Sequence, residues 1–272
     1  CLKCNRHIRF ELLLNRALAM GGDYLATGHY ARVRRHPPEA GQAEQPHPPQ
    51  AGSYQLLRAV DAAKDQSYVL CMLGQEQLAH ALFPIGVHTK PQVRALARQF
   101  GLPVAEKVES QDLCFIPDGD HAGFLERFGG LAPNPGPIVN RAGQVLGEHR
   151  GLWRYTIGQR RGLGIAAEAP LYVLELDARR NALVVGSADE LGCRELWAKE
   201  VNYVEGPPSR PLEVTAKIRY KAADVPARLY PLPAERARIV WEQPVRAAAP
   251  GQAVVFYQGE VLVGGGFIES IR

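Results

Sequence analysis

Residues 24–30, YLATGHY, decide the fold class of this chain, because they indicate a short buried strand that ends in a glycine turn. Upstream, residues 8–18 carry apolar side chains near helical spacing, and the glycines at 21 and 22 end that run. A helix followed by a strand that ends in a glycine turn is typical of an α/β sheet. The ligands of such sheets bind at the carboxyl ends of the strands.

The segment after this strand contains an interruption and then further regular structure. Residues 36–53 are rich in Pro, Gln, Ala and Gly without a period, which predicts a flexible surface insertion. A strand is expected to resume over 54–60. Thr89 is predicted to cap a helix that ends at Gly101, with a proline in its first turn and Gln92 closing a capping box.

The sequence pattern changes from about residue 137, where short predicted strands alternate with Gly, Pro and Asn turns. Residues 171–176 and 182–185 predict a hairpin. Residues 212–220 alternate apolar and polar side chains, the pattern of a half-buried strand, and two more strands are expected between 253 and 268. The last third is therefore predicted to be antiparallel, as a small β-barrel.

Composition limits the class of protein. The net charge of +4 permits an anionic partner without requiring one, and basic residues gather at 32–35, 154–161 and 217–221. For any one of these clusters, simple solvation remains the more frequent explanation. No run approaches the roughly 20 apolar residues of a membrane span, and no signal peptide is evident, so a cytoplasmic protein without membrane contact is expected. Five cysteines, an odd number, argue against a disulfide framework.

The cysteines suggest sulfur chemistry. Cys4 and Cys114 lie among polar residues at segment boundaries, whereas a packing thiol would lie in an apolar stripe. Cys1 and Cys4 form a Cys-x-x-Cys pair at the start of a helix, where a thiol ionises more easily. The competing interpretations are a pair without a chemical role and a zinc site, but zinc needs two more ligands, the other cysteines are scattered singly and no His pair lies at ligand spacing, so no metal is predicted. Cys71 and Cys193 are expected to be structural.

Three short polar or glycine-rich runs remain. Residues 64–67, KDQS, lie between a strand and an apolar helix, and Asp65 or Ser67 can simply cap that helix. Residues 158–164, GQRRGLG, form a basic loop able to bring backbone and guanidinium groups close to a phosphate, although such a loop alone is a weak signal. The glycines at 264–266 are expected to mark tight strand packing.

Taken together, these runs resemble one family, the tRNA-specific 2-thiouridylases, which install sulfur at C2 of the wobble uridine. The matching segments follow the family order over nearly the whole chain: 1–5 with 8–10, 26–32, 64–68, 83–86, 110–116, 155–160, 219–220, 250–252 and 264–266. The resemblance implies a partial ATP-pyrophosphatase domain of the adenine-nucleotide α-hydrolase type, a small central domain and a C-terminal antiparallel β-barrel.

The resemblance also implies roles. Cys4 resembles the nucleophile of the family and Cys114 the cysteine that carries a persulfide, whose sulfur comes from a donor protein. ATP, with Mg²⁺, activates the uracil C2 oxygen, sulfur displaces AMP, and a Cys4–Cys114 disulfide is the by-product. Gly28 resembles part of the ATP site. The positions that resemble tRNA contacts are His29, Lys64, Asp65, Gln66, Arg219, Tyr220 and Gln252.

The expected division is a catalytic half-domain over 1–124, a central tRNA-binding domain over 125–192 and a barrel over 193–272. The family opens with a strand and a phosphate-gripping loop that this sequence lacks, since it begins at Cys1 inside a motif. The sequence is therefore interpreted as a fragment, predicted to be inactive alone. The alternatives are a non-catalytic tRNA-binding module derived from the family and an RNA-binding protein held by zinc.

Overall fold

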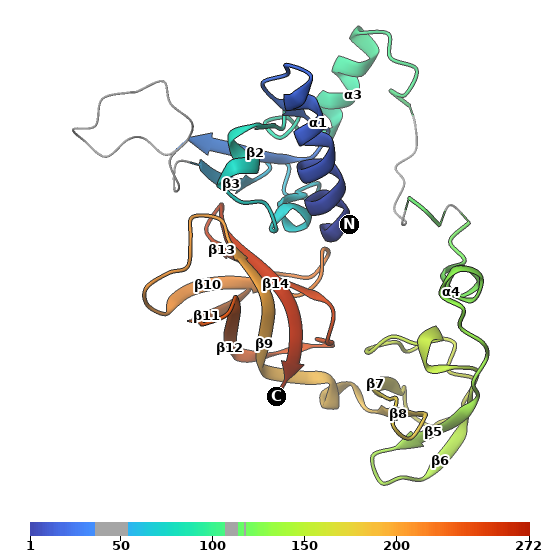
Figure 1. The fold of residues 1–272 in the computed structure, drawn as a ribbon. Coiled ribbons are helices and arrows are strands. Elements are labelled where there is room, and N and C mark those ends of the chain that lie inside the picture. Colours follow the sequence, from blue (N-terminus) through green and yellow to red (C-terminus); the bar gives the residue numbers. More distant parts are fainter. Residues whose placement is uncertain (36–53, 107–113, 117) are drawn as a thin grey trace. The chain divides into compact units, whose positions relative to one another are not determined.

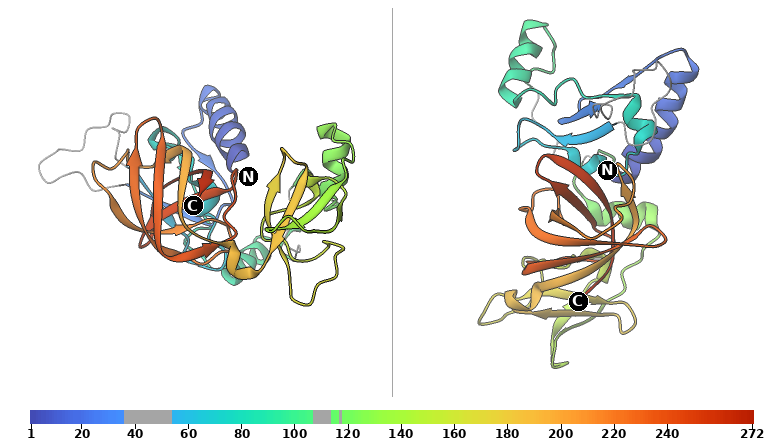
Figure 2. Two further views of the ribbon diagram at one scale, coloured as in Figure 1. Left: turned by 90° about the horizontal axis from the view of Figure 1, so that it is seen from below. Right: turned by 90° about the vertical axis from the view of Figure 1, so that its left-hand side faces the viewer.

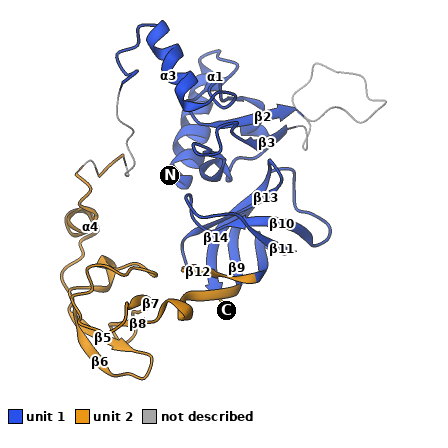
Figure 3. Cartoon of the chain, turned by 180° about the vertical axis from the view of Figure 1, so that it is seen from behind, with its two compact units in different colours: residues 1–108, 195–242, 250–270 blue, residues 109–194, 243–249, 271–272 orange. Residues whose placement is uncertain are grey.

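The computed structural model describes residues 1–35, 54–106, 114–116 and 118–272 (Figure 1). The predicted insertion at 36–53 lies outside these residues. The chain divides into two compact units, coloured separately in Figure 3. The first unit comprises 1–108, 195–242 and 250–270, and the second comprises 109–194, 243–249 and 271–272. None of the helices in the described ranges combines the length and apolar character that a membrane crossing requires.

The first unit opens with a helix, as predicted. Its elements before the barrel are η1 (Cys4–Leu13), α1 (Leu14–Ala19), β1 (Leu25–Ala26), β2 (Ala31–Arg35), β3 (Tyr54–Arg58), η2 (Ser67–Leu70), α2 (Gln75–Ala79), β4 (Ala81–Leu82) and α3 (Lys90–Gln99). The opening helix is wider than an α-helix over η1, and the N–H of Leu14 reaches back to the carbonyl of Arg9. Such π-type segments are rare and are often found at functional sites.

The strand that the YLATGHY stretch predicts is present, but it is shorter and less buried than expected. It covers only Leu25–Ala26 and pairs in parallel with β4. Tyr24 is 57% exposed and Ala26 is exposed, so the prediction of a buried strand is wrong. The physical reason is that, among the described strands, the two-residue β4 is the only partner of β1, and a pair this small covers little apolar surface.

The predicted capped helix is confirmed as α3. Thr89 is its N-cap, and the backbone N–H of Thr89 donates to Oε1 of Gln92 at 2.8 Å. Pro91 lies in the first turn, where its missing N–H leaves no helical hydrogen bond unmade. The helix gives way to Gly101, whose φ of 63° is the left-handed conformation expected after a helix end.

A closed antiparallel barrel of six strands completes the first unit, as the sequence predicts. Its strands are β9 (Gly192–Tyr203), β10 (Leu212–Lys217), β11 (Val225–Leu232), β12 (Arg236–Arg246), β13 (Ala253–Gln258) and β14 (Val261–Ile271). The order β13-β10-β11-β12-β9-β14 closes through the β13–β14 pair. Figure 2 shows these strands from two further sides, coloured from yellow-orange to red. The predicted alternation holds in β10, where Val214 and Ala216 are buried between partly exposed neighbours.

The barrel and the N-terminal segment share one hydrophobic core. Phe10 of η1, Leu56 of β3 and Leu70 of η2 belong to the same buried cluster as Tyr257 and Leu262 of the barrel. The hairpin of β2 and β3 also extends the barrel sheet, since Leu57 pairs with Val261 at the edge of β14. The predicted glycine run at 264–266 packs tightly, as expected: a Cβ at Gly264 would lie 2.2 Å from the carbonyl oxygen of Asn202.

The second unit contains a small sheet with its own core. Its elements are α4 (His121–Gly129), β5 (Gly136–Asn140), β6 (Val145–His149), η3 (Leu152–Arg154), β7 (Tyr172–Asp177), β8 (Ala182–Gly186) and η4 (Ala188–Leu191). The sheet order is β6-β5-β8-β7, and the predicted hairpin is confirmed as the antiparallel pair β7–β8. Ile138, Leu163, Val173, Leu183 and Val185 form the core. The division at residues 124 and 192 stays a prediction.

Candidate functional site

Cys4 is an exposed thiol on a firmly anchored backbone. It begins η1, and the next residue, Asn5, is only 3% exposed. The amide of Asn5 donates to the carbonyl of Val69 at 2.9 Å, which ties the start of the helix to η2. Phe10, further along η1, is buried in the shared core. The sequence around Cys4 therefore fixes its position while leaving the sulfur open to a reaction partner.

Lys3 attaches this N-terminal turn to the barrel. Its Nζ forms an ion pair with Glu200 of β9 and lies 4.7 Å from the centroid of the Phe267 ring on β14. The two partners lie on strands 197 and 264 residues later in the chain. Sequence reasoning missed Lys3, because a lysine in a polar run gives no signal of a distant ring or carboxylate.

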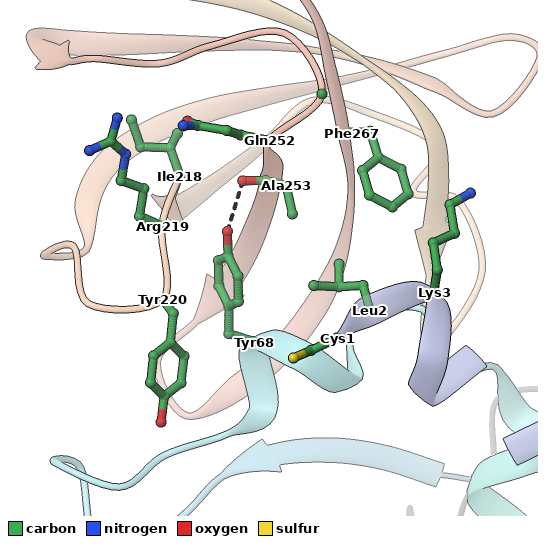
Figure 4. Close-up of a pocket in the computed structure, with 11 residues that line it drawn as sticks. Cys1, Leu2, Lys3, Tyr68, Ile218, Arg219, Tyr220, Gln252, Ala253 and Phe267 are labelled. Atoms are coloured by element: carbon green, nitrogen blue, oxygen red, sulfur yellow. Dashed lines mark hydrogen bonds between the residues drawn. The ribbon is translucent and has the colours of Figure 1, made fainter. Parts of the chain in front are cut away.

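A pocket of about 360 Å³ lies where this turn meets the barrel (Figure 4). Three segments meet there: the turn itself, η2, and the barrel with its loops. The lining residues are Cys1, Leu2, Lys3, Tyr68, Ile218, Arg219, Tyr220, Gly251, Gln252, Ala253 and Phe267. The fold thus gathers Arg219, Tyr220 and Gln252, which the sequence predicted as contacts from two separate motifs, around one opening that also contains Cys1.

The pocket wall offers aromatic and polar groups together. The hydroxyl of Tyr68 donates to the carbonyl of Ala253 at 2.9 Å, which fixes that ring. The Tyr220 ring lies edge-on to it, with 6.3 Å between the centroids. Oε1 of Gln252 is buried and accepts no hydrogen bond from the part of the chain that the structure describes. Aromatic faces, a guanidinium and an unsatisfied amide are the groups that bind unstacked RNA bases and their phosphates.

Asp65 and Gln66 face the protein. Oδ1 of Asp65 accepts hydrogen bonds from the N–H groups of Ala59 and Ser67, both at 3.1 Å, and Oδ2 accepts from the Ser67 hydroxyl at 2.9 Å. Gln66 exchanges two hydrogen bonds with the backbone of Tyr30. Asp65 thus bonds the first N–H group of η2, but the N-cap of η2 is Gln66 and makes no side-chain capping bond, so the interpretation of Asp65 or Ser67 as the cap is wrong. A direct contact of these residues with RNA stays a prediction.

Gly28 and His29 follow β1 and differ in exposure. Gly28 is exposed, and a Cβ at this position would meet no atom within 4 Å. His29 is 6% exposed, with Nδ1 2.8 Å from the Thr27 hydroxyl and Nε2 3.1 Å from Nη1 of Arg9. Burial, helped by the charge of Arg9, lowers the pKa of His29 to about 4. The imidazole is therefore neutral near pH 7.

Cys114 belongs to the second unit, and its thiol is exposed. The neighbouring Ile116 is buried, whereas the Phe115 ring is 58% exposed and lies 5.4 Å from the Phe124 ring of α4. The motif residues immediately before Cys114, 110–113, lie outside the described ranges. The two reactive candidates, Cys4 and Cys114, are thus both accessible, each on its own unit, and their meeting stays a prediction.

The remaining thiols are packed away, as the sequence predicts. Cys71 is fully buried in the shared core, and burial raises its pKa to about 12. Cys193 is 5% exposed, and burial likewise raises its pKa to about 11. Neither thiol ionises near neutral pH, so neither competes with the exposed cysteines. Within the described ranges, no cluster of three or more His, Cys, Asp or Glu side chains is placed to hold a metal ion.

Comparison with known proteins gives a consistent result along the whole chain. Three family models match in succession: a tRNA methyl transferase HUP domain over 1–118, a tRNA methyl transferase PRC-barrel domain over 122–187 and an aminomethyltransferase beta-barrel domain over 193–268. A tRNA-specific 2-thiouridylase MnmA of Roseiflexus castenholzii is 51% identical over 98% of this chain and 73% of its own length. Those of Moorella thermoacetica and Geobacter metallireducens are each 48% identical, over 100% and 99% of this chain and 73% and 70% of their own lengths.

Proposed function

This chain belongs to the family of tRNA-specific 2-thiouridylases, and we propose that the full-length protein replaces the C2 oxygen of the tRNA wobble uridine by sulfur at the expense of ATP. One observation supports this most directly. The exposed Cys4 thiol lies three residues beyond Cys1, which lines the pocket formed with Arg219, Tyr220 and Gln252. The turn that carries the nucleophile thereby also lines the pocket whose barrel side offers groups suited to RNA.

The residues after β1 suit a nucleotide. Gly28 follows the carboxyl end of a strand in a parallel pair, where α/β sheets bind their ligands, and its backbone is open to approach. ATP, with Mg²⁺, supplies the activation that makes the C2 oxygen a leaving group. The neutral, buried His29 supports this segment through Thr27 and Arg9. We assign the nucleotide contact to Gly28.

The sulfur chemistry then needs two thiols in different roles. The terminal sulfur of a persulfide on Cys114 attacks C2, and the oxygen leaves with the nucleotide phosphate. The Cys4 thiolate attacks the Cys114 sulfur, so the sulfur–sulfur bond breaks, 2-thiouridine is released and a Cys4–Cys114 disulfide forms. An external dithiol reduces that disulfide, and a sulfur-donor protein reloads Cys114. The reaction takes place in the cytoplasm, where tRNA and ATP occur together.

The test compares Cys4→Ser and Cys114→Ser, made in the full-length protein, with Cys193→Ser, which changes a buried thiol outside the proposed chemistry. Cys114→Ser is expected to lose sulfur loading by a persulfide donor, seen as the missing mass of one sulfur atom on the intact protein. Both exposed-cysteine variants are expected to lower the rate of tRNA thiolation by about 10³-fold or more. Thiolation at the wild-type rate by Cys114→Ser would rule out the persulfide assignment.

A further inference from the structure

The glycine-rich basic loop of the second unit has no role in the chemistry above. It follows η3 and leads to β7, and it presents Arg160 and Arg161 at the surface. Between residues 155 and 167 the sequence contains no carboxylate.

The loop is held in one conformation by its own hydrogen bonds. The N–H of Gly158 donates to the carbonyl of Val173 at 2.8 Å, and the N–H of Val173 donates to the carbonyl of Gln159 at 2.9 Å. The side chain of Gln159 accepts from the N–H of Thr156 at 3.1 Å and donates to the carbonyl of Arg161 at 2.9 Å. Arg160 is therefore enclosed between two fixed positions, so binding a ligand would not require ordering this backbone.

The second half of the loop leaves its backbone donors free. Gly162 and Gly164 have φ of 77° and 69°, whereas Arg161 and Leu163 have the ordinary negative φ. Leu163 is buried in the core and holds this half in place. None of the N–H groups from 160 to 164 donates to an acceptor in the ranges that the structure describes. Successive N–H groups on a backbone of alternating handedness form concavities that bind anions.

The two arginines of the loop differ from other arginines of the second unit in their ion pairs. Elsewhere in the second unit arginines pair with carboxylates, as Arg154 does with Glu126, Arg141 with Glu190 and Arg180 with Asp177. Among the residues described, Arg160 and Arg161 make no ion pair with any carboxylate. Two exposed guanidinium groups thus stand at the start of a run of unsatisfied backbone donors, and both features favour an anionic ligand.

We propose that residues 160–164 form a phosphate-binding site for the sugar–phosphate backbone of the tRNA substrate, with Arg160 and Arg161 supplying the charge and the N–H groups of 162–164 the orientation. This inference rests on the proposed function, because it takes the tRNA as the source of the phosphate. Phosphate contacts of this kind position an RNA without reading its sequence.

The experiment measures the association constant of the whole chain for tRNA as a function of salt concentration. The logarithm of this constant falls with the logarithm of salt, and each lost phosphate contact makes that fall shallower by about 0.7 to 0.9. The Arg160→Gln/Arg161→Gln variant is expected to bind tRNA about tenfold more weakly, with a salt slope that is shallower by about 1 to 2. Gly162→Ala keeps the charge but opposes the positive φ, and it is expected to weaken binding as well. Thermal unfolding checks that both variants are folded.

The matched control is Arg150→Gln/Arg179→Gln, which removes the same charge from two other exposed arginines of the second unit. If the control lowers the slope as much as the loop variant, or if the loop variant binds like wild type, the phosphate site is wrong. An effect on the binding of free pyrophosphate but not of tRNA would also overturn it. Failure of the wild-type chain to bind tRNA would instead contradict the proposed function itself.

Discussion

At the scale of single residues, the first unit relies on polar groups that are buried and paired. Arg58 lies 3.5 Å from the centroid of the Tyr257 ring and contacts Asp65 at 3.6 Å and Asp224 at 3.0 Å. Asp65 in turn holds Ser67, whose hydroxyl lies 3.2 Å from that of Tyr257. The sequence showed only that this polar run lay before a helix. The Asp65 carboxylate also pairs with Arg58, which stacks on the barrel residue Tyr257. This pairing depends on the tertiary fold, so local sequence could not indicate it.

A prediction at this scale concerns His29. Its pKa is about 4 in the folded protein and near 6.5 when unfolded, so the unfolded state binds more protons between these values. The stabilisation is complete above pH 6.5 and is lost as the pH falls from 6.5 to 4, with a total of roughly 3 kcal/mol. His29→Gln is expected to flatten the free energy of unfolding over this window, measured by urea denaturation at each pH.

The control for His29 is His88→Gln, which removes an imidazole from a partly exposed turn of the same unit. It is expected to leave the slope of stability against pH in place. A slope that persists in His29→Gln would show that other groups cause the pH dependence of folding.

At the scale of elements, several strands with a buried face were predicted, whereas β9 and β12 were not, although their burial alternates as well. The period-two alternation in β10 and the turn residues between β7 and β8 define those elements from local sequence alone. The parallel pairing of β5 with β8 was not predictable, since it joins strands more than 40 residues apart. The widened turn of η1 also escaped prediction, because its apolar spacing does not differ from that of an ordinary helix.

A prediction at this scale concerns the crowded glycines of β14. An alanine at 264 would place its Cβ 2.2 Å from the carbonyl oxygen of Asn202 on β9, and backbone atoms cannot move aside as a side chain does. Gly264→Ala is therefore expected to lower the free energy of unfolding by about 1–3 kcal/mol. The measurement is urea denaturation of the purified protein.

Gly28→Ala provides the comparison, because the space around that Cβ is open and its φ is not positive. It is expected to change stability by less than about 0.5 kcal/mol. If both alanines had equal effects, steric crowding would not be what requires glycine at 264.

At the scale of the whole chain, the pocket depends on contacts between segments that are remote in sequence. The amide of Asn202 on β9 donates to the carbonyls of Cys71 and Leu73, at 2.8 and 2.9 Å. Gln75 likewise donates to the carbonyl of Val204 at 2.6 Å. Local patterns could not reveal these contacts. Only the order of the motifs indicated that Arg219, Tyr220 and Gln252 act together, and the structure adds the pocket that they share with Cys1.

The prediction at this scale is that the N-terminal segment and the barrel open together. Asn202→Ala leaves two buried carbonyls without their donor and is expected to cost about 1–3 kcal/mol. Hydrogen exchange should then show an equal loss of protection in η2 and in β13, since both belong to one cooperative core. Faster exchange in η2 alone would mean that the barrel is stable without the segment.

The shared core has a consequence for exchanging parts between relatives. The family models end one region at residue 118 and begin the last at 193, which suggests natural borders for chimaeras. A barrel transplanted at those borders would bring foreign partners for Phe10, Leu56 and Leu70. We therefore expect the two segments to have co-evolved, so that functional hybrids arise only when residues 1–108 and 195–270 are inherited from the same parent.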